Sequence, residues 1–152
     1  MQELMEKLAN ILLVEDNKMD IALTLDAFRE ARLANKIHVA RNGEEALQYL
    51  FGEGEFADRI RYPLPNIILL DLKMPGIDGL EVLKRVKSTP EIKRIPIIIL
   101  TSSKEEGDRA MSYDLGANSY LVKPISFDGF LEVVKKVTDY WIALNIEPPL
   151  NG

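Results

Sequence analysis

The chain has 152 residues, of which 47% are hydrophobic, and this is enough for one domain with a proper core. Its formal net charge of −5 argues against a surface built to coat DNA or an anionic membrane, because such partners require basic patches. It contains no cysteine and one histidine, which excludes a disulfide scaffold, a thiolate metal site, a cysteine nucleophile and a two-histidine mechanism.

Short apolar runs alternate with amphipathic segments along the chain. Each run is about four residues long and is bounded by polar or turn residues, which is typical of a strand buried on both faces. The predicted strands are residues 11–14, 37–40, 67–70, 97–100 and 119–122. No stretch approaches the ~18 apolar residues of a membrane span, and residues 1–8 mix charged with apolar side chains, so we expect a cytoplasmic protein without membrane contact.

The segments between these strands have the apolar spacing of helices. Helices are predicted at residues 17–34, 44–51, about 80–86, 104–115, and from an N-capping Ser126 onward. Residues 52–65 have glycines at one end and prolines at the other, so they predict a long surface loop. The alternation predicts a doubly wound, five-stranded parallel sheet with helices on both faces. One domain should span residues 10–144, between an N-terminal extension (1–9) and a C-terminal tail (145–152).

Reactive side chains follow four of the predicted strands: Glu15 and Asp16, Asp71, Thr101, and Lys123. The carboxyl ends of parallel strands meet at one edge of the sheet, where ligands bind. Three carboxylates there would repel one another, and a Mg²⁺ ion relieves that repulsion through oxygen ligands. A hydroxyl and an ammonium group suit phosphoryl oxygens. Asp71, after the most apolar strand, is the best candidate for a nucleophile that forms an aspartyl phosphate.

Four stretches together resemble the receiver domain of two-component response regulators, which has a flavodoxin-like fold. They are residues 11–17 (ILLVEDN), 67–79 (IILLDLKMPGIDG), 96–102 (PIIILTS) and 116–124 (GANSYLVKP), and the resemblance covers roughly residues 10–137. The long loop before the third strand and the aromatic extension of the last helix resemble small stand-alone regulators paired with phytochrome-like histidine kinases.

The resemblance implies that Asp71 accepts a phosphoryl group from a histidine kinase or a phosphotransfer protein. Asp16 and Asp71 would bind Mg²⁺ directly, Glu15 would act through a water, and the backbone carbonyl of Lys73 would complete the protein ligands. The protein would promote only its own phosphorylation and dephosphorylation, without further enzymatic activity or direct contact with nucleic acid.

The same resemblance implies how the phosphoryl group is held and read out. Thr101 and Lys123 would hold its oxygens, and Thr101 with Tyr120 would form the switch that alters a partner-binding or dimer-binding face. The Lys123–Pro124 bond is expected to be cis. Two residues depart from the common pattern: Glu15 stands where many members have Asp, and Lys73 places a basic group two residues after the acceptor.

Other functions agree less well with these residues. An aspartyl phosphatase needs a second Asp two residues after its nucleophile, where this chain has Lys73. A flavin or dinucleotide binder would need a Gly-x-Gly-x-x-Gly loop, which is missing. A receiver-like binding module that works without phosphorylation remains the alternative. It usually lacks site residues, whereas Asp16, Asp71, Thr101 and Lys123 are all present here.

Two further features have competing interpretations. His38 is predicted to be a packed strand residue rather than a relay histidine. The apolar stripe of the last helix suits core packing, but Trp141 and Leu144 extend beyond the usual receiver helix and could form a homodimer surface.

Overall fold

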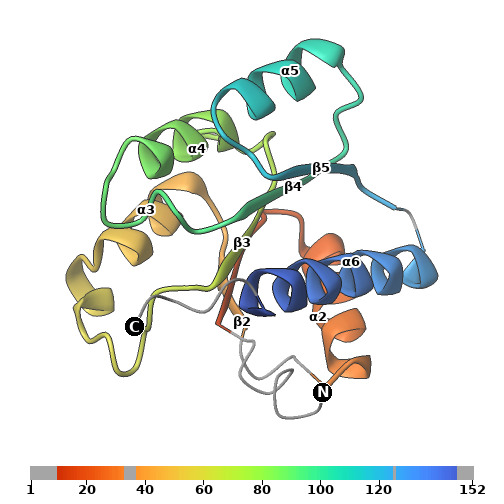
Figure 1. The fold of residues 1–152 in the computed structure, drawn as a ribbon, viewed down its shortest axis with the longest axis horizontal. Coiled ribbons are helices and arrows are strands. Elements are labelled where there is room, and N and C mark those ends of the chain that lie inside the picture. Colours follow the sequence, from red (N-terminus) through yellow and green to blue (C-terminus); the bar gives the residue numbers. More distant parts are fainter. Residues whose placement is uncertain (1–9, 33–36, 125, 147–152) are drawn as a thin grey trace.

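The computed structural model describes residues 10–32, 37–124 and 126–146, the last seven of them by their backbone alone. Five parallel strands form one sheet in the order β2-β1-β3-β4-β5, with helices on both faces (Figure 1). The strands are β1 (Ile11–Val14), β2 (Ile37–Ala40), β3 (Ile67–Leu70), β4 (Ile97–Thr101) and β5 (Ser119–Val122). The helices are α2 (Lys18–Glu30), α3 (Gly43–Phe51), α4 (Gly79–Lys87), α5 (Glu106–Asp114) and α6 (Phe127–Ile146). The predicted doubly wound, flavodoxin-like architecture is confirmed.

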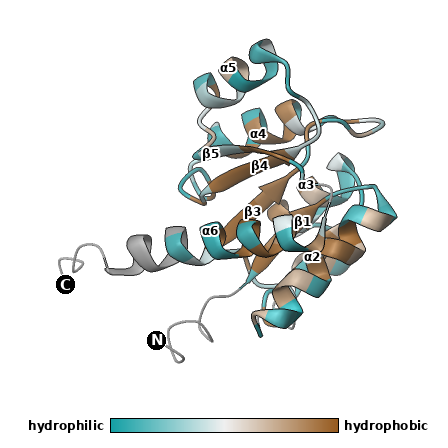
Figure 2. Cartoon of the chain, turned by 90° about the vertical axis from the view of Figure 1, so that its right-hand side faces the viewer, coloured by the Kyte–Doolittle hydropathy of each residue, from teal (hydrophilic) through white to brown (hydrophobic). Residues whose placement is uncertain are grey.

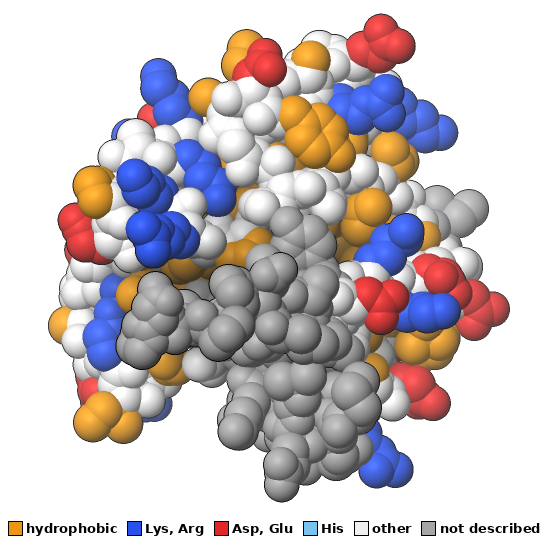
Figure 3. All heavy atoms as spheres, viewed as in Figure 1, with side chains coloured by type: hydrophobic (Ala, Val, Ile, Leu, Met, Phe, Trp, Pro, Cys, Tyr) orange, Lys and Arg blue, Asp and Glu red, His pale blue; other side chains and the backbone are white. Residues whose placement is uncertain are grey.

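The three central strands are apolar on both faces, which is why they read as continuous hydrophobic runs (Figure 2). Successive side chains of a strand point to opposite faces. In β1, Leu12 and Val14 therefore pack toward α3 and α4, whereas Ile11 and Leu13 pack toward α2 and α6. Charged side chains of both signs lie among hydrophobic ones on the described part of the surface in Figure 3.

The predicted helix 17–34 ends earlier than expected. α2 stops at Glu30, because the chain turns at Arg32, whose φ of 64° is incompatible with a continuing right-handed helix. At the other end, Ser126 accepts a hydrogen bond from the Gly129 N–H through its hydroxyl, as predicted for the N-cap of α6. The side chains of Trp141 and Leu144 lie outside the described residues, so the dimer hypothesis stays a prediction.

The prediction of a surface loop at residues 52–65 is wrong in part. A short 3₁₀ helix (Gly54–Ala57) places Phe56 in the core, where it is 4% exposed. Its ring lies 5.2 Å from that of Tyr49 and 5.1 Å from that of Tyr62. His38 joins this cluster, with its ring 4.5 Å from Tyr49, so its predicted packed position is confirmed. The segment thus packs an aromatic ring against His38 of β2 and Tyr49 of α3.

Candidate functional site

Three carboxylates meet at the carboxyl edge of the sheet. Glu15 and Asp16 follow β1 and Asp71 follows β3, and one oxygen of each lies within 4.8 Å of the others. Glu15 and Asp71 are buried, at 3% and 4% exposure, whereas Asp16 is exposed. A Cβ atom at Gly79 would collide with the backbone oxygen of Asp71, so glycine is needed where α4 begins beside the site. The donor set is all oxygen, which fits a hard cation such as Mg²⁺.

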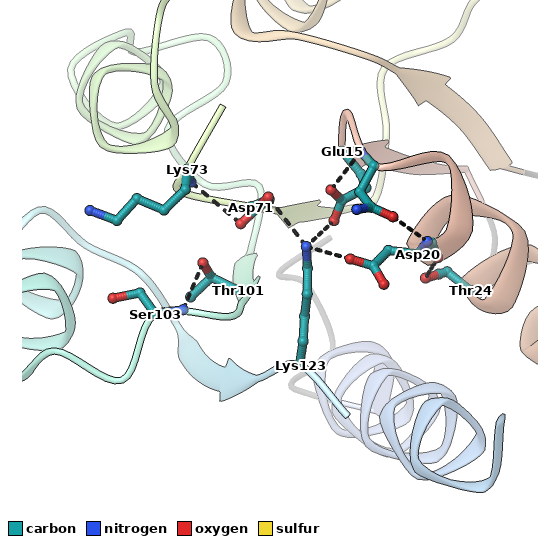
Figure 4. A network of polar contacts seen from close by, with 9 residues as sticks. Glu15, Asp20, Thr24, Asp71, Lys73, Thr101, Ser103 and Lys123 are labelled. Carbon is teal, nitrogen blue, oxygen red and sulfur yellow. Dashed lines mark hydrogen bonds and ion pairs between the residues drawn. The ribbon is translucent and has the colours of Figure 1, made fainter. Parts of the chain in front are cut away.

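Lys123 brings a single positive charge into this cluster from the end of β5. Its Nζ atom lies 2.8 Å from Glu15 Oε1 and 3.3 Å from Asp71 Oδ2 (Figure 4). A third carboxylate, Asp20 Oδ2, lies 2.8 Å from the same Nζ atom. Asp20 is not among the residues expected at the strand ends, because it lies in the first turn of α2. Its signal in the sequence was an acidic residue one helical turn after the Glu15–Asp16 pair.

Burial and charge shift the pKa values of the two central groups. Burial raises the pKa of Glu15 to about 7, and its hydrogen bonds with Lys123 and with the backbone N–H of Asn17 only partly oppose this. Burial disfavours the charged form of Lys123, but its hydrogen bonds to Asp20 and Glu15 outweigh that effect and raise its pKa. The ammonium therefore stays charged and neutralises part of the crowded negative charge.

Thr101 lies on β4 and Tyr120 on the neighbouring strand β5, two positions out of register with one another. They are linked through a third residue. The Thr101 hydroxyl is fully buried and accepts a hydrogen bond from the Ser103 N–H at 3.4 Å. The Tyr120 hydroxyl donates to the carbonyl of Ser103 at 3.0 Å. Ser103, which the sequence did not single out, therefore connects the two proposed switch residues.

Lys73 is not directed at the carboxylate cluster. Its backbone N–H donates to Asp71 Oδ1 at 3.4 Å (Figure 4). Its Nζ atom lies 3.1 Å from Asp108 Oδ2 on α5. The Ser103 hydroxyl donates to the same Asp108 oxygen at 2.5 Å. These two hydrogen bonds, the Ser103 bond foremost, lower the pKa of Asp108.

The expectation of a cis peptide bond before Pro124 is wrong for this structure. The described residues contain no cis peptide bond, so Lys123–Pro124 is trans in this structure. The two isomers of an X–Pro bond differ by only about 0.5–1 kcal/mol, so the proline alone does not determine which one is adopted.

Comparison with known proteins decides the family, because residues 11–135 match the response regulator receiver domain. The chain belongs to this family. The response regulator Rcp1 of Synechocystis sp. is 37% identical over 132 residues, covering 87% of this chain and 88% of Rcp1. The probable methanogenesis regulatory protein FilR2 of Methanothrix harundinacea is 37% identical over 139 residues, covering 91% of this chain and 86% of FilR2.

Solved receiver structures agree with this assignment. The phosphorylated cyanobacterial phytochrome response regulator RcpA superposes with a TM-score of 0.80 at 40% identity, covering 88% of this chain and 94% of RcpA. The Mn²⁺-bound form of Rcp1 has a TM-score of 0.77 at 37% identity, covering 86% of this chain and 92% of Rcp1. Receiver domains bind Mg²⁺ or Mn²⁺ at an acidic pocket, and single-domain receivers are generally signalling proteins rather than enzymes. None of the helices in the described part of this receiver is long and apolar enough to cross a membrane.

Proposed function

We propose that this receiver domain accepts a phosphoryl group on Asp71 from a phosphohistidine of a histidine kinase or phosphotransfer protein. One observation carries the proposal: the buried Asp71 carboxylate lies within the three-carboxylate cluster with the Lys123 ammonium 3.3 Å from its Oδ2 atom. A phosphoryl group adds negative charge to the carboxylate that accepts it. A cation-binding cluster and a fixed ammonium beside a buried carboxylate are suited to offset that added charge.

The transfer is a nucleophilic displacement at phosphorus. An oxygen of Asp71 forms a bond to phosphorus as the P–N bond to the donor imidazole breaks, and that electron pair returns to the imidazole nitrogen. The phosphoryl group is then removed by hydrolysis, in which a water oxygen attacks phosphorus, the aspartyl oxygen leaves as carboxylate, and the proton lost by the water passes to the released phosphate or to solvent. Lys123 is charged and 10% exposed, so it is placed to pair with the phosphoryl oxygens as their charge increases. The Thr101 hydroxyl, buried at the end of β4, would donate to another oxygen.

The metal ligands would be Asp16 and Asp71 directly, Glu15 through a water, and the backbone carbonyl of Lys73. The mutual approach of the Glu15, Asp16 and Asp71 oxygens supports this assignment. A bound Mg²⁺ would offset the negative charge of the phosphoryl group and its attacking and leaving oxygens. The longer Glu15 side chain accepts the Asn17 N–H at 3.0 Å through Oε2, which directs Oε1 toward the site.

The readout would pass from Thr101 through Ser103 to Tyr120. A Thr101 hydroxyl turned toward the phosphoryl group stops accepting from Ser103, whose carbonyl holds the Tyr120 hydroxyl. The affected face is formed by α5, β5 and the start of α6, and it would bind a partner or a second copy of the chain through the last helix. Because RcpA is described as a phytochrome response regulator, we infer that the phosphoryl donor is a phytochrome-like kinase.

The test is intact mass spectrometry after incubation with acetyl phosphate and Mg²⁺. The wild-type protein should gain the mass of one phosphoryl group, and Asp71→Asn should gain none although its side chain has nearly the same shape. Asp26→Asn is the matched control, since Asp26 lies on the outer surface of α2 and pairs with Arg29. A folded wild-type protein that stays unmodified would instead support the phosphorylation-independent binding module.

A further inference from the structure

Asp20 is the acidic residue at the site that the metal cluster does not include. Its carboxylate lies 2.8 Å from Lys123 Nζ, closer than Asp71 at 3.3 Å (Figure 4). The three carboxylates that approach within 4.8 Å of one another are Glu15, Asp16 and Asp71, so Asp20 contacts the ammonium from outside this group.

The start of α2 fixes the position of Asp20. Its backbone N–H donates to the Asn17 side chain at 3.0 Å, in the N-cap of the helix. Its carbonyl accepts the Thr24 hydroxyl at 2.6 Å. With the backbone held on both sides, the side chain is directed from the first turn of α2 toward the end of β5 (Figure 4).

The ammonium group of Lys123 is already surrounded by carboxylates in this arrangement. A lysine ammonium carries three N–H donors and no acceptor, and three carboxylates surround this one: Glu15, Asp20 and Asp71. The side chain is 10% exposed, so water has little access to it. A new oxygen ligand on Lys123 therefore competes with these three partners.

We propose that Asp20 is a positioning residue that holds Lys123 in the unphosphorylated state and competes with the phosphoryl oxygens for its ammonium; this rests on the phosphorylation of Asp71. Glu15 and Asp71 belong to the metal cluster, and Asp71 would carry the phosphoryl group itself. Asp20 is the remaining partner, and its carboxylate can be given up without disturbing a metal ligand. Lys123 thus exchanges a contact with α2 for a contact with the phosphoryl group.

Two effects of opposite sign follow from this competition. Without the Asp20 carboxylate, Lys123 is free to bind a phosphoryl-like anion, so the anion should bind more tightly. In the protein without the anion, the freed ammonium pairs more closely with Glu15 and Asp71, which opposes metal binding. Damage to the fold would instead weaken the binding of both the anion and the metal ion.

The experiment measures beryllofluoride, a phosphoryl analogue, by NMR titration at saturating Mg²⁺, and Mg²⁺ alone by the same method. Asp20→Asn should bind beryllofluoride roughly three- to tenfold more tightly than wild type, as expected when a contact with the net strength of an ordinary hydrogen bond is lost from one of two competing states. It should bind Mg²⁺ more weakly. Asp26→Asn, on the outer surface of the same helix, should match wild type in both titrations.

If Asp20 acts by positioning Lys123, the effect of Asp20→Asn requires Lys123. If Asp20→Asn acts only by removing a negative charge, the effect persists without Lys123. In a Lys123→Ala background, Asp20→Asn should no longer tighten beryllofluoride binding; NMR follows affinities into the millimolar range, so weak binding there remains measurable. Equal tightening in that background, or unchanged or weaker binding of Asp20→Asn in the wild-type background, overturns the proposal. Asp20→Ser provides a second variant, and thermal unfolding checks that each protein is folded.

The proposed function is tested by separate arms of the same experiment. Wild type should bind beryllofluoride and Asp71→Asn should not. If both results hold and Asp20→Asn behaves as wild type, only the role of Asp20 fails. If wild type itself does not bind, phosphorylation of Asp71 fails, and the competition fails with it.

Discussion

The Lys73 ammonium lies 3.1 Å from the Asp108 carboxylate, and this ion pair connects the segment directly after Asp71 to α5. Asp108 also accepts the Ser103 hydroxyl, and Ser103 contacts both Thr101 and Tyr120. The Lys73–Asp108 ion pair is therefore linked through Ser103 to the two proposed switch residues. The Lys73 side chain is 56% exposed, so the pair is solvent-screened and adds little to stability.

Removing Lys73 and removing Asp108 should change the lifetime of the phosphoryl group in opposite directions. Lys73→Ala removes an ammonium that could move to the phosphoryl oxygens, so hydrolysis should be roughly two- to fivefold faster, in keeping with an exposed ion pair. Asp108→Asn frees the same ammonium, so hydrolysis should be slower. The rate of phosphoryl loss, followed by intact mass after removal of donor, checks both. Changes of the same sign in the two variants would contradict this reading.

Asp16 is exposed and should matter for the metal but not for the fold. Asp16→Ala removes one of three repelling carboxylates, so its thermal stability should equal or slightly exceed that of wild type in the absence of metal. Phosphorylation by acetyl phosphate in Mg²⁺ should be abolished, as it should be for wild type in excess EDTA. Intact mass and thermal unfolding provide the two readouts. Undiminished phosphorylation in a folded Asp16→Ala protein would exclude Asp16 as a ligand.

Tyr120 should respond to an anion at Asp71 only through the Thr101 hydroxyl. In wild type, beryllofluoride should shift the NMR signals of Thr101, Ser103 and Tyr120. Thr101→Ala should remove the shift at Tyr120 while leaving Asp71 in place. Tyr120→Phe loses the hydrogen bond to Ser103 and should cost about 1 kcal/mol of stability or less, because the hydroxyl is only partly buried. An equal Tyr120 shift without the Thr101 hydroxyl would rule out this coupling.

His38 should make the stability of the fold depend on pH. Burial lowers its pKa, although Glu45 and Glu55 oppose that shift, and its buried Nε2 atom has no hydrogen-bond partner among the described residues. The unfolded histidine has a pKa of about 6.5, so below that pH the unfolded chain binds more protons than the folded one. The free energy of unfolding therefore decreases as the pH falls.

The matched variant is His38→Phe, which keeps an aromatic ring against Tyr49 and removes the titrating group. Denaturant unfolding at about pH 5 and about pH 7.5 should show a smaller difference in unfolding free energy for His38→Phe than for wild type. Glu55→Gln should enlarge the difference, because Glu55 favours the charged histidine. Identical pH dependence in wild type and His38→Phe would show that His38 is not responsible.

Local patterns in the sequence were sufficient to predict the sheet and most of the site. Strands buried on both faces must be apolar throughout, so 11–14, 67–70 and 97–100 could be read from composition alone. Parallel strands end at one edge, so the residues after them had to converge, and Glu15, Asp16 and Asp71 do so.

Only the tertiary structure decided which groups pair across that edge. Lys123 is 103 positions from Asp20 in the chain, and their 2.8 Å contact depends on how α2 packs beside the end of β5. The same is true of Lys73 with Asp108, and of Phe56, whose glycine- and proline-flanked segment gave no local sign of a buried ring. Strand and helix patterns report which face of an element is apolar. The direction of a long polar side chain depends instead on charges and surfaces that distant segments bring to it.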